Sequence, residues 1–436
     1  MKSLDKFRGS LIGLALGDAL GAPLEGMKAG RVKDVYGLVR GFVDPQAAWK
    51  SRPYHYRPVG VYTDDTQQSL CLAESLIRCY GFNADDFART LLKLWQAGGE
   101  SRSGAFRGIG PVFKKAMNKL AAGAKPQDTG EPSAGIGASM RAAPAGLYFC
   151  DDREALLKAS IEQALLTHKD PRAIALSACV AYAVARSAGG DWDALKPGQR
   201  AQDLIEFAAE AEKIIATEYL VHLPPLVYEF FGLFYRSIEP FRHWHGMEHE
   251  LVLRQIVNLA NQAFPPEKIN SPAQNFALAA GVTALFIAIT SRDFSSGALE
   301  AINLGRATDS AGAMTGAILG GRFGESAMPG EWKDQLKNCE QIGLRAEALY
   351  QKSFAGLKLG DLKKMELKLT VFENQEREKF VQKMIAKGEY DPEAIAKKAE
   401  AKKEKKELGA AVKKIKHKAK EGKRRREKAP WRRWED

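Results

Sequence analysis

The sequence predicts an all-α fold, and three observations support it. Apolar residues recur at helical spacing over residues 67–94, 173–187 and 201–219. Two further segments, 7–25 and 305–321, carry glycines at four-residue intervals, which places those glycines on one face of a helix. No stretch of any length alternates apolar and polar residues with the period of two that marks a half-buried strand. Helices are therefore the expected regular elements.

The glycine-striped segment near the N-terminus predicts close packing of two helices. Its glycines are Gly9, Gly13, Gly17 and Gly21. Each glycine inside a helix costs about 1 kcal/mol relative to alanine, so a closely packed partner is the expected compensation. The natural partner is the late segment, whose striped glycines are Gly312, Gly316 and Gly320. A dinucleotide-binding loop is excluded because no strand precedes the segment and its spacing is not G-x-G-x-x-G.

Two predicted helix starts carry short side chains with hard oxygen atoms. They are Thr63, Asp64 and Asp65 at the first start, and Thr308, Asp309 and Ser310 at the second. Asp or Ser is expected to cap the second helix, and Gln67 follows Asp64 by three residues as in a capping box. If the two starts converge, their oxygen atoms suit Mg²⁺, Mn²⁺ or Ca²⁺. Either motif alone is better explained as an ordinary N-cap.

A glycine-rich turn and a few polar residues complete the candidate site. The turn contains Gly135, Gly137, Ser139, Met140 and Arg141. Glycines let backbone amides approach an anion, and a helix is expected to begin just after them. The other candidates are Arg107, Gly108 and His168. Taken singly, such a turn is more often only a turn, and a lone histidine is more often a core or surface residue.

A histidine cluster offers a minor alternative. His243, His245 and His249 form an H-x-H-x-x-x-H pattern that is compatible with zinc. Trp244 and Met247 stand between them and no acidic or cysteine ligand completes the set, so the pattern is weak evidence for a metal.

Composition and charge narrow the class of protein. The chain has 436 residues and a formal net charge of +12. Its scattered cysteines lack C-x-x-C spacing and are interpreted as buried free thiols in a reducing compartment: Cys71, Cys79, Cys150, Cys179 and Cys339. The longest apolar run, 276–289, is shorter than the roughly 20 residues that span a bilayer. Asp18 interrupts the apolar N-terminal segment, which is therefore assigned to the mature fold, and a cytoplasmic location is expected.

In this order along the chain, the motifs resemble those of the ADP-ribosylglycohydrolase family, which includes ADP-ribosyl-acceptor hydrolases and dinitrogenase-reductase-activating glycohydrolases. The matching segments are G-D-A-L-G-A-P-L-E ending at Glu25, T-D-D-T-Q from Thr63, G-x-G-x-S-M-R-x-x-P from Gly135, T-H-x-x-P around His168, and T-D-S from Thr308. The resemblance runs from about Phe7 to about Trp332. It implies a compact multi-helix bundle with a pair of metal ions at the bottom of a cleft.

The resemblance also implies roles for individual residues. Two divalent cations, Mg²⁺ or Mn²⁺, would be held by Thr63, Asp64, Asp65, Asp309 and Ser310. Glu25, Asp64 or Asp65 would handle protons during hydrolysis of an N- or O-glycosidic bond that releases ADP-ribose. The substrate would be bound by Arg107, Gly108, Gly135, Gly137, Ser139, Met140, Arg141 and His168. The acceptor would be an ADP-ribosylated protein side chain or nucleic acid.

Two positions depart from the family pattern. Ile136 stands where the family has Asn, and Ala307 stands where the family has the first Asp of its late metal motif. A methyl group cannot coordinate a cation, so one metal site is expected to be impaired. Three interpretations follow: an inactivated variant of a hydrolase, a pseudoenzyme that still binds ADP-ribose, or a structural relative. The intact neighbouring motifs favour the first, and restoring Asp at Ala307 would separate them.

The positive charge is concentrated at the C-terminal end. Residues 397–436 hold 18 Lys/Arg and 7 Asp/Glu, whereas the preceding residues hold 47 and 46. We expect a family-like domain at 1–350, a helical extension at 351–396 and a basic tail at 397–436. The tail is either a solvated segment or an attachment to nucleic acid or the ribosome through phosphate contacts. The oligomeric state is not predicted, and no membrane partner is expected.

Overall fold

The computed structural model describes residues 1–98 and 104–394, and the regular elements of these residues are all helices, which confirms the all-α prediction. The helices of the first half are α1 (Leu4–Gly21), α2 (Ala29–Tyr36), α3 (Gln46–Trp49), α4 (Asp64–Arg78), α5 (Ala84–Trp95), α6 (Pro111–Ala121), α7 (Ala143–Tyr148), α8 (Arg153–Leu165), α9 (Pro171–Gly189) and α10 (Pro197–Glu218). Those of the second half are α11 (Leu233–Ile238), α12 (Phe241–Trp244), α13 (His249–Gln262), η6 (Ala277–Gly281), α14 (Val282–Thr290), α15 (Phe294–Asn303), α16 (Thr308–Phe323), α17 (Gly330–Gln335), α18 (Cys339–Gln351) and α19 (Leu362–Ala386).

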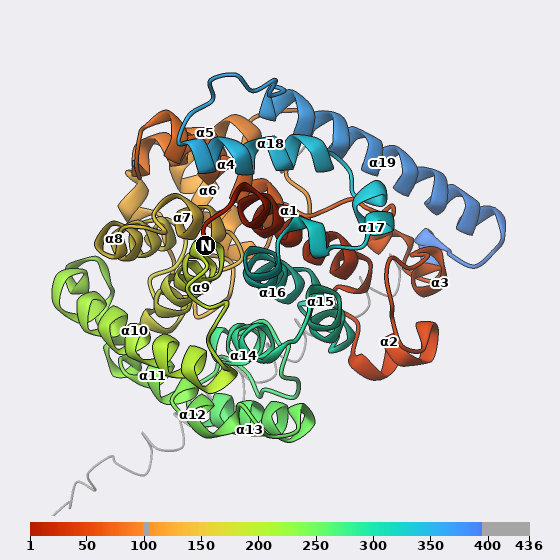
Figure 1. The fold of residues 1–436 in the computed structure, drawn as a ribbon. Coiled ribbons are helices and arrows are strands. Elements are labelled where there is room, and N and C mark those ends of the chain that lie inside the picture. Colours follow the sequence, from red (N-terminus) through yellow and green to blue (C-terminus); the bar gives the residue numbers. More distant parts are fainter. Residues whose placement is uncertain (99–103, 395–436) are drawn as a thin grey trace, which may run out of the picture.

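Helices α1 and α16 lie side by side at the centre of the molecule (Figure 1), as the two glycine stripes predict. A Cβ atom on Gly17 would lie 1.9 Å from the carbonyl oxygen of Gly312. The corresponding distance is 2.4 Å from Gly13 to the oxygen of Gly316. Real Cβ atoms do not approach backbone this closely, so only glycine permits the contact.

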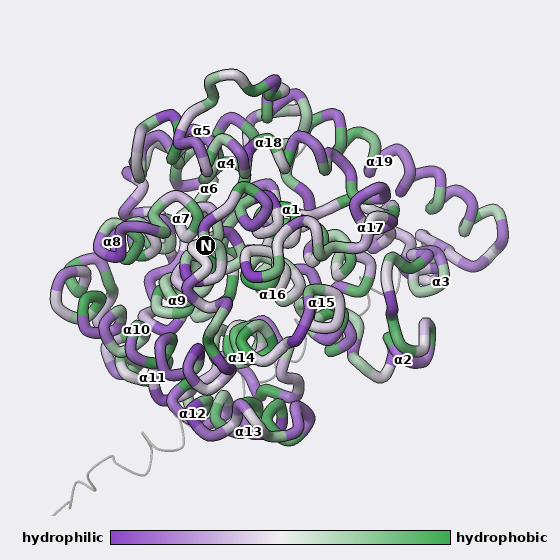
Figure 2. The backbone as a smooth tube through the Cα atoms, viewed as in Figure 1, coloured by the Kyte–Doolittle hydropathy of each residue, from purple (hydrophilic) through white to green (hydrophobic). Residues whose placement is uncertain are grey.

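The other helices surround this pair and leave it almost without solvent contact. Helix α9 and the pair η6–α14 are buried along nearly their whole length, so the apolar run at 276–289 is a buried helical segment. Figure 2 shows mixed purple and green along the outer helices α13 and α19, as expected for elements with one face in water. No helix of the described residues is both long and apolar enough to cross a membrane.

Helix α19 lies within the expected extension at 351–396, and its inward face is only partly apolar. Leu362 and Leu369 are buried, whereas Phe372 is 36% exposed. The inward positions include two carboxylates, Glu366 and Glu373. A pattern search for apolar residues misses such a face, because the buried charges are matched by arginines from distant parts of the chain. The basic tail from residue 397 lies outside the described residues.

The expectation for the cysteines needs correction. Cys71 and Cys179 are buried free thiols, but the remaining three cysteines are only half-buried. Among the histidines of the weak H-x-H-x-x-x-H pattern, His249 Nδ1 lies 2.6 Å from Glu300 Oε1, so this ring has a carboxylate partner.

Candidate functional site

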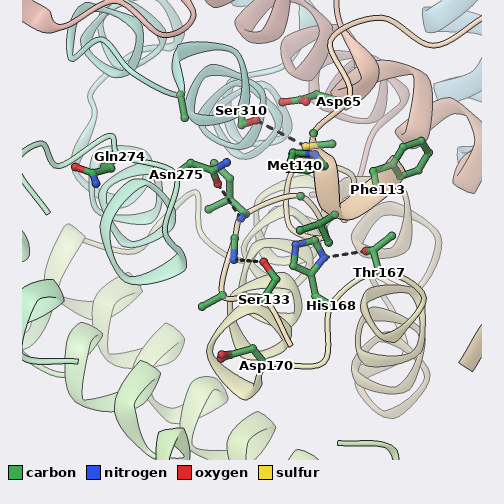
Figure 3. A pocket seen from close by; sticks show the side chains of 18 of the residues that line it. Asp65, Phe113, Ser133, Met140, Thr167, His168, Asp170, Gln274, Asn275 and Ser310 are labelled. Carbon is green, nitrogen blue, oxygen red and sulfur yellow. Dashed lines mark hydrogen bonds between the residues drawn. The ribbon is translucent and has the colours of Figure 1, made fainter. Parts of the chain in front are cut away.

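A cavity of about 670 Å³ opens where the amino ends of α4 and α16 meet the turn at residues 133–141. Figure 3 shows Asp65 and Ser310 close together at one end of it and His168 at the other. The lining includes most of the predicted site residues: Glu25, Asp64, Asp65, Gly108, Gly135, Gly137, Met140, Arg141, His168, Ala307, Asp309 and Ser310. The structure therefore brings together motifs that are separated by more than half of the chain.

The amino end of α4 is fixed by a carboxylate from α1. Thr63 is the N-cap, and its hydroxyl accepts from the amide of Asp65 at 3.3 Å. Asp18 is fully buried and accepts the amide of Thr63 at 2.9 Å, and the hydroxyl of Thr66 at 2.6 Å. The predicted capping box is wrong, because the Gln67 side-chain amide donates to the Ala105 carbonyl instead. Asp18 thus orients the first turn of α4, with Asp64 facing the cavity.

The amino end of α16 lacks a side-chain cap. Ala307 occupies the N-cap position itself, so the expected capping by Asp or Ser is wrong. Arg306, just before it, has a left-handed backbone with φ of 68°. The Thr308 hydroxyl donates to the Gly21 carbonyl of α1 at 2.8 Å, which ties this helix start to the same central helix. Ala307 lines the cavity, and an Asp at an N-cap position can accept from the first amides of a helix.

The buried carboxylates at the two helix starts repel one another. Burial, followed by the charge of Asp309, holds the pKa of Asp65 well above its usual range. Burial and the charges of Asp18 and Glu25 raise the pKa of Asp64 to about 7. Such an arrangement of carboxylates is costly unless a cation neutralises it.

The donor atoms of this cluster suit hard divalent cations. Asp65 Oδ2 is buried and has no hydrogen-bond partner among the described residues. Oxygen donors of the Asp, Thr and Ser type are those that Mg²⁺ and Mn²⁺ prefer. No three His, Cys, Asp or Glu side chains of residues 1–98 and 104–394 are already gathered as a metal-binding group. The hydroxyl groups of Thr63 and Ser310 are the additional oxygens that a cation would use here.

Glu25 lies at the rim of the cavity. Its carboxylate faces Arg57, with an oxygen-to-nitrogen distance of 3.8 Å, and its side chain is 44% exposed. Burial of the carboxylate in the concave rim raises its pKa, which the charge of Arg57 partly opposes. A carboxyl group with a raised pKa, open to solvent and beside the cluster, is suited to proton transfer.

The turn at 133–141 forms the opposite wall. Gly135, Gly137 and Met140 line the cavity, whereas Ser139 is fully buried outside the lining. Ile136 provides no polar side chain, as the sequence indicates. An amide nevertheless lies at this place, because Asn275 accepts from the Ile136 backbone N–H at 3.3 Å and lines the same cavity.

Arg141 connects this wall to the carboxylate cluster. Its guanidinium donates to Gln68 Oε1 at 2.6 Å, and Gln68 donates in turn to Asp64 Oδ2 at 2.6 Å. Burial lowers the pKa of Arg141 to about 9, and the nearby charge of Asp64 opposes that effect. The relay orients one oxygen of Asp64 and leaves the other available.

His168 faces the cavity as a neutral ring. Burial and then the charge of Arg141 lower its pKa to about 3. The Thr167 hydroxyl, which accepts from Arg141, lies 2.8 Å from His168 Nδ1 and forms a hydrogen bond with it. His168 Nε2 points toward Gly135, whose Cβ would lie 3.5 Å from it. The ring therefore presents a polar nitrogen to the cavity.

Arg107 does not line the cavity, although Gly108 does. The Arg107 side chain is fully buried in an ion pair with Glu366 of α19, at 2.8 Å. Its contribution to the site comes from the backbone, because its carbonyl accepts from the Asp64 N–H at 2.7 Å. The structure thus does not support a direct substrate contact from this guanidinium.

Several functional residues were missed by sequence reasoning. They are Asp18, Arg57, Gln68 and Asn275. Gln68 contacts Asp64 within α4, whereas the other three contact the site or the turn at 133–141 from elsewhere in the chain. Only Asp18 carried a signal, since it is a charged residue inside an apolar, glycine-striped helix. Burying a charge there requires partners, and those partners are the amides of α4.

The amino-acid sequence is similar to those of several known proteins, and two of these have names that describe hydrolases. The family profile described as ADP-ribosylglycohydrolase matches residues 1–356. An uncharacterized protein of Archaeoglobus fulgidus is 29% identical over 347 residues, which cover 80% of this chain and 96% of that protein. The ADP-ribosylarginine hydrolase Tri1 of Serratia proteamaculans is 26% identical over 351 residues, covering 80% of each chain.

A vertebrate relative and a solved structure extend the comparison. The ADP-ribosylhydrolase ARH3 of Gallus gallus is 26% identical over 79% of this chain and 93% of that protein. The fold is similar to that of a solved structure titled ADP-ribosylglycohydrolase-related protein complex, with a TM-score of 0.54 and 27% identity. That likeness covers 80% of this chain and 98% of the solved one.

Proposed function

This chain belongs to the ADP-ribosylglycohydrolase family, and from that premise we propose that it binds ADP-ribosyl groups and removes them from an acceptor with the help of divalent cations. The observation that carries the proposal is the meeting of the α4 and α16 starts at one cavity with an unpartnered buried oxygen on Asp65. Two relatives bear names that describe hydrolysis of ADP-ribosylated groups.

The cavity suits a nucleoside diphosphate group. Its volume of about 670 Å³ falls in the range of small-molecule sites. The backbone of Gly135 and Gly137 can approach an anion, and the neutral His168 ring offers a polar nitrogen beside them. Phe113 adds an apolar wall on the same side. We assign the phosphates and the distal part of the ligand to this end.

The ribose that bears the scissile bond belongs at the carboxylate end. Asp64, Asp65, Asp309 and the Thr63 and Ser310 hydroxyls would hold the cations, as Mg²⁺ or Mn²⁺. Cations of this type lower the pKa of bound water and stabilise developing charge. The side chains of this carboxylate and hydroxyl cluster would orient the ribose. Arg141 holds Asp64 in place through Gln68.

Glu25 is assigned the proton transfer at the rim. Its carboxylate faces the cavity from the loop after α1 and is open to solvent on one side. It can take a proton from the water that attacks the anomeric carbon and pass a proton to the leaving nitrogen or oxygen of the acceptor as the glycosidic bond breaks. Asp64 and Asp65 are the alternative proton acceptors.

Ala307 weakens this machinery at one position. Without a carboxylate at the α16 N-cap, one cation would bind weakly. The second candidate function is therefore binding of ADP-ribose without hydrolysis, and it is favoured by this single substitution. An inactivated hydrolase regains turnover when Ala307 is replaced by Asp, whereas a protein specialised for binding does not.

The acceptor is proposed from charge alone. The basic residues at 397–436 would attract a nucleic acid or ribosomal target by phosphate contacts. A chain ending before residue 397 should lose RNA and DNA binding at low salt. Unchanged binding would leave an ADP-ribosylated protein as the better candidate acceptor.

The test of the proposed function is a titration with ADP-ribose in the presence of Mn²⁺, followed by an assay for release of ADP-ribose from ADP-ribosyl-arginine. Binding with release by Ala307→Asp, and binding without release by the unmodified chain, would support a weakened hydrolase. Absence of binding in both proteins would contradict the ADP-ribose assignment.

A further inference from the structure

The C-terminal helix α19 carries two buried carboxylates that reach the site from beyond the family match. The matched residues end at 356, and α19 begins at Leu362. Glu366 is fully buried and Glu373 is 1% exposed. Buried carboxylates are rarely tolerated without a charged partner. Each of these two finds an arginine from the body of the protein.

Glu366 binds three side chains next to the amino end of α4. Its carboxylate accepts from Arg107 at 2.8 Å, from Gln67 at 2.9 Å and from the Tyr62 hydroxyl at 2.6 Å. The Arg107 carbonyl then accepts from the Asp64 N–H. Helix α19 therefore reaches the first residue of α4 through one intervening residue.

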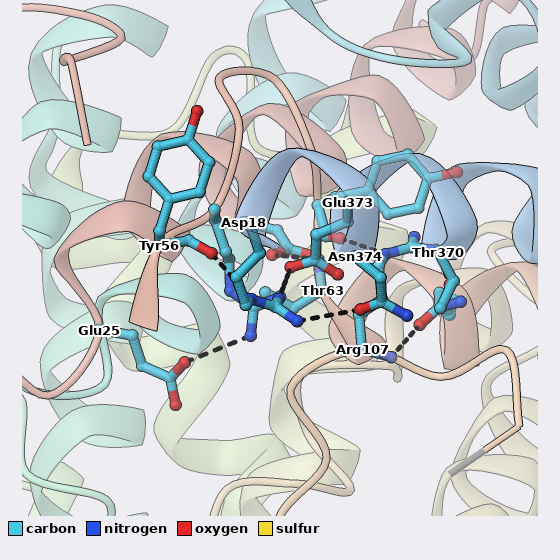
Figure 4. A network of polar contacts seen from close by, with 12 residues as sticks. Asp18, Glu25, Tyr56, Thr63, Arg107, Thr370, Glu373 and Asn374 are labelled. Atoms are coloured by element: carbon cyan, nitrogen blue, oxygen red, sulfur yellow. Dashed lines mark hydrogen bonds and ion pairs between the residues drawn. The ribbon is translucent and has the colours of Figure 1, made fainter. Parts of the chain in front are cut away.

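Glu373 holds a second arginine at the rim of the cavity (Figure 4). Its Oε1 accepts from Arg57 at 2.9 Å and from Arg377 at 2.6 Å. On the other side, Arg57 faces Glu25 at 3.8 Å. The guanidinium of Arg57 thus lies between one carboxylate from α19 and one from the site.

Arg57 is also close to the cluster assigned to the cations. A Cβ atom on Gly108 would lie 2.7 Å from Arg57 Nη2 and 3.4 Å from Asp64 Oδ1. The guanidinium and the Asp64 carboxylate therefore border the same small space. A guanidinium that moved further in would neutralise the carboxylates that a divalent cation needs, because both compete for the same charges.

We propose that Glu373 is a positioning residue that anchors Arg57 at the rim beside Glu25 and so keeps the Asp64 and Asp309 carboxylates available to divalent cations. The inference rests on the proposed function. It assigns α19 a role at the site beyond packing, since the helix supplies the counter-charge that determines where Arg57 lies.

The test compares four proteins by the affinity for Mn²⁺ alone, measured from the electron paramagnetic resonance signal of the free ion. The proteins are the unmodified chain, Glu373→Gln, the double variant Glu373→Gln/Arg57→Met, and Glu378→Gln as a matched control. Glu378 is an exposed residue on the same helix whose carboxylate accepts from Gln382. Melting temperatures and ADP-ribose binding are recorded for all four.

Glu373→Gln retains an oxygen for Arg57 but loses the charge, and we expect its Mn²⁺ affinity to fall by about tenfold. Removal of the guanidinium in the double variant should restore the affinity, which a merely structural loss would not do. A fifth protein, Glu373→Asp, keeps the charge and should restore part of the affinity, and the control should match the unmodified chain.

The outcomes separate this inference from the function on which it rests. If the unmodified chain binds Mn²⁺ and ADP-ribose while Glu373→Gln binds Mn²⁺ equally well, the positioning role is overturned and the function stands. If Glu373→Gln is weakened and the double variant is not restored, α19 acts only by packing, and the inference is again overturned. If the unmodified chain binds neither probe, the proposed function fails and the inference fails with it.

Discussion

The Asp18 carboxylate of α1 accepts the Thr66 hydroxyl of α4 at 2.6 Å, across 48 positions of the chain. One residue earlier, Gly17 lies against Gly312 of α16. A single stretch of α1 therefore touches both helices whose amino ends form the site. The distance between the two oxygen-rich helix starts is determined by this central helix.

The glycine contact gives the first prediction. Gly17→Ala places a methyl group 1.9 Å from the Gly312 carbonyl oxygen, so the helices must separate. We expect the free energy of unfolding to fall by about 3 kcal/mol. Gly30→Ala is the matched control, because nothing lies within 4 Å of a Cβ at this position of α2. Urea unfolding measures both, and equal stabilities would contradict the close contact.

Asp18 gives the second prediction. Asp18→Asn replaces one acceptor oxygen with an NH₂ group that faces the buried donors of Thr63 or Thr66, so a donor meets a donor and the carboxylate charge is lost. We expect a loss of about 2 kcal/mol in the free energy of unfolding, and weaker Mn²⁺ binding because the first turn of α4 is released. Asp361→Asn is the control. Its exposed side chain caps α19 by accepting from Lys364, which Asn does equally well. Similar losses in both variants would count against the role of Asp18.

The contrast between the glycines and Asp18 shows what sequence can and cannot provide. A stripe of glycines is a local pattern, and it predicts a close helix contact whichever helix is the partner. Asp18 appears in the sequence only as a charge in an apolar helix, because its partners lie 45 and 48 residues away. The burial of the inward carboxylates of α19 could not be predicted for the same reason, because their arginine partners lie in the first quarter of the chain.

His168 gives a prediction on pH. Its pKa is about 3 in the folded protein and about 6.5 in an unfolded chain. The unfolded state therefore binds the proton first, so this contribution to stability is present above pH ~6.5 and is lost as the pH falls. Between about pH 6.5 and pH 5 the loss amounts to about 2 kcal/mol.

His168→Gln removes the titrating group and should flatten this part of the stability curve. Urea unfolding at about pH 7 and about pH 5 provides the comparison with the unmodified chain. His222→Gln is the control, because His222 lies in a short surface turn away from the cavity lining. An unchanged slope in His168→Gln would show that the ring is not buried in its neutral form.

Glu25 provides a prediction that separates binding from turnover. In the Ala307→Asp background, Glu25→Gln should leave the Kd for ADP-ribose nearly unchanged, because the ligand contacts assigned above lie elsewhere. Release of ADP-ribose should fall by about 10² to 10⁴, the usual contribution of a general acid or base. Glu378→Gln in the same background serves as the control. An unaffected rate in Glu25→Gln would transfer the proton role to Asp64 or Asp65.

Ala307 is the N-cap of α16 and lines the cavity, and the proposed function rests on a carboxylate at this position completing the oxygen cluster. The most direct measurement is calorimetric titration of ADP-ribose with Mn²⁺ into the unmodified chain and into Ala307→Asp, with hydrolysis followed in the same samples. We predict that both proteins bind, that the affinity of Ala307→Asp depends more strongly on Mn²⁺, and that only this variant hydrolyses the glycosidic bond at an appreciable rate. Binding by neither protein would contradict the account and leave a helical scaffold whose cavity serves another ligand.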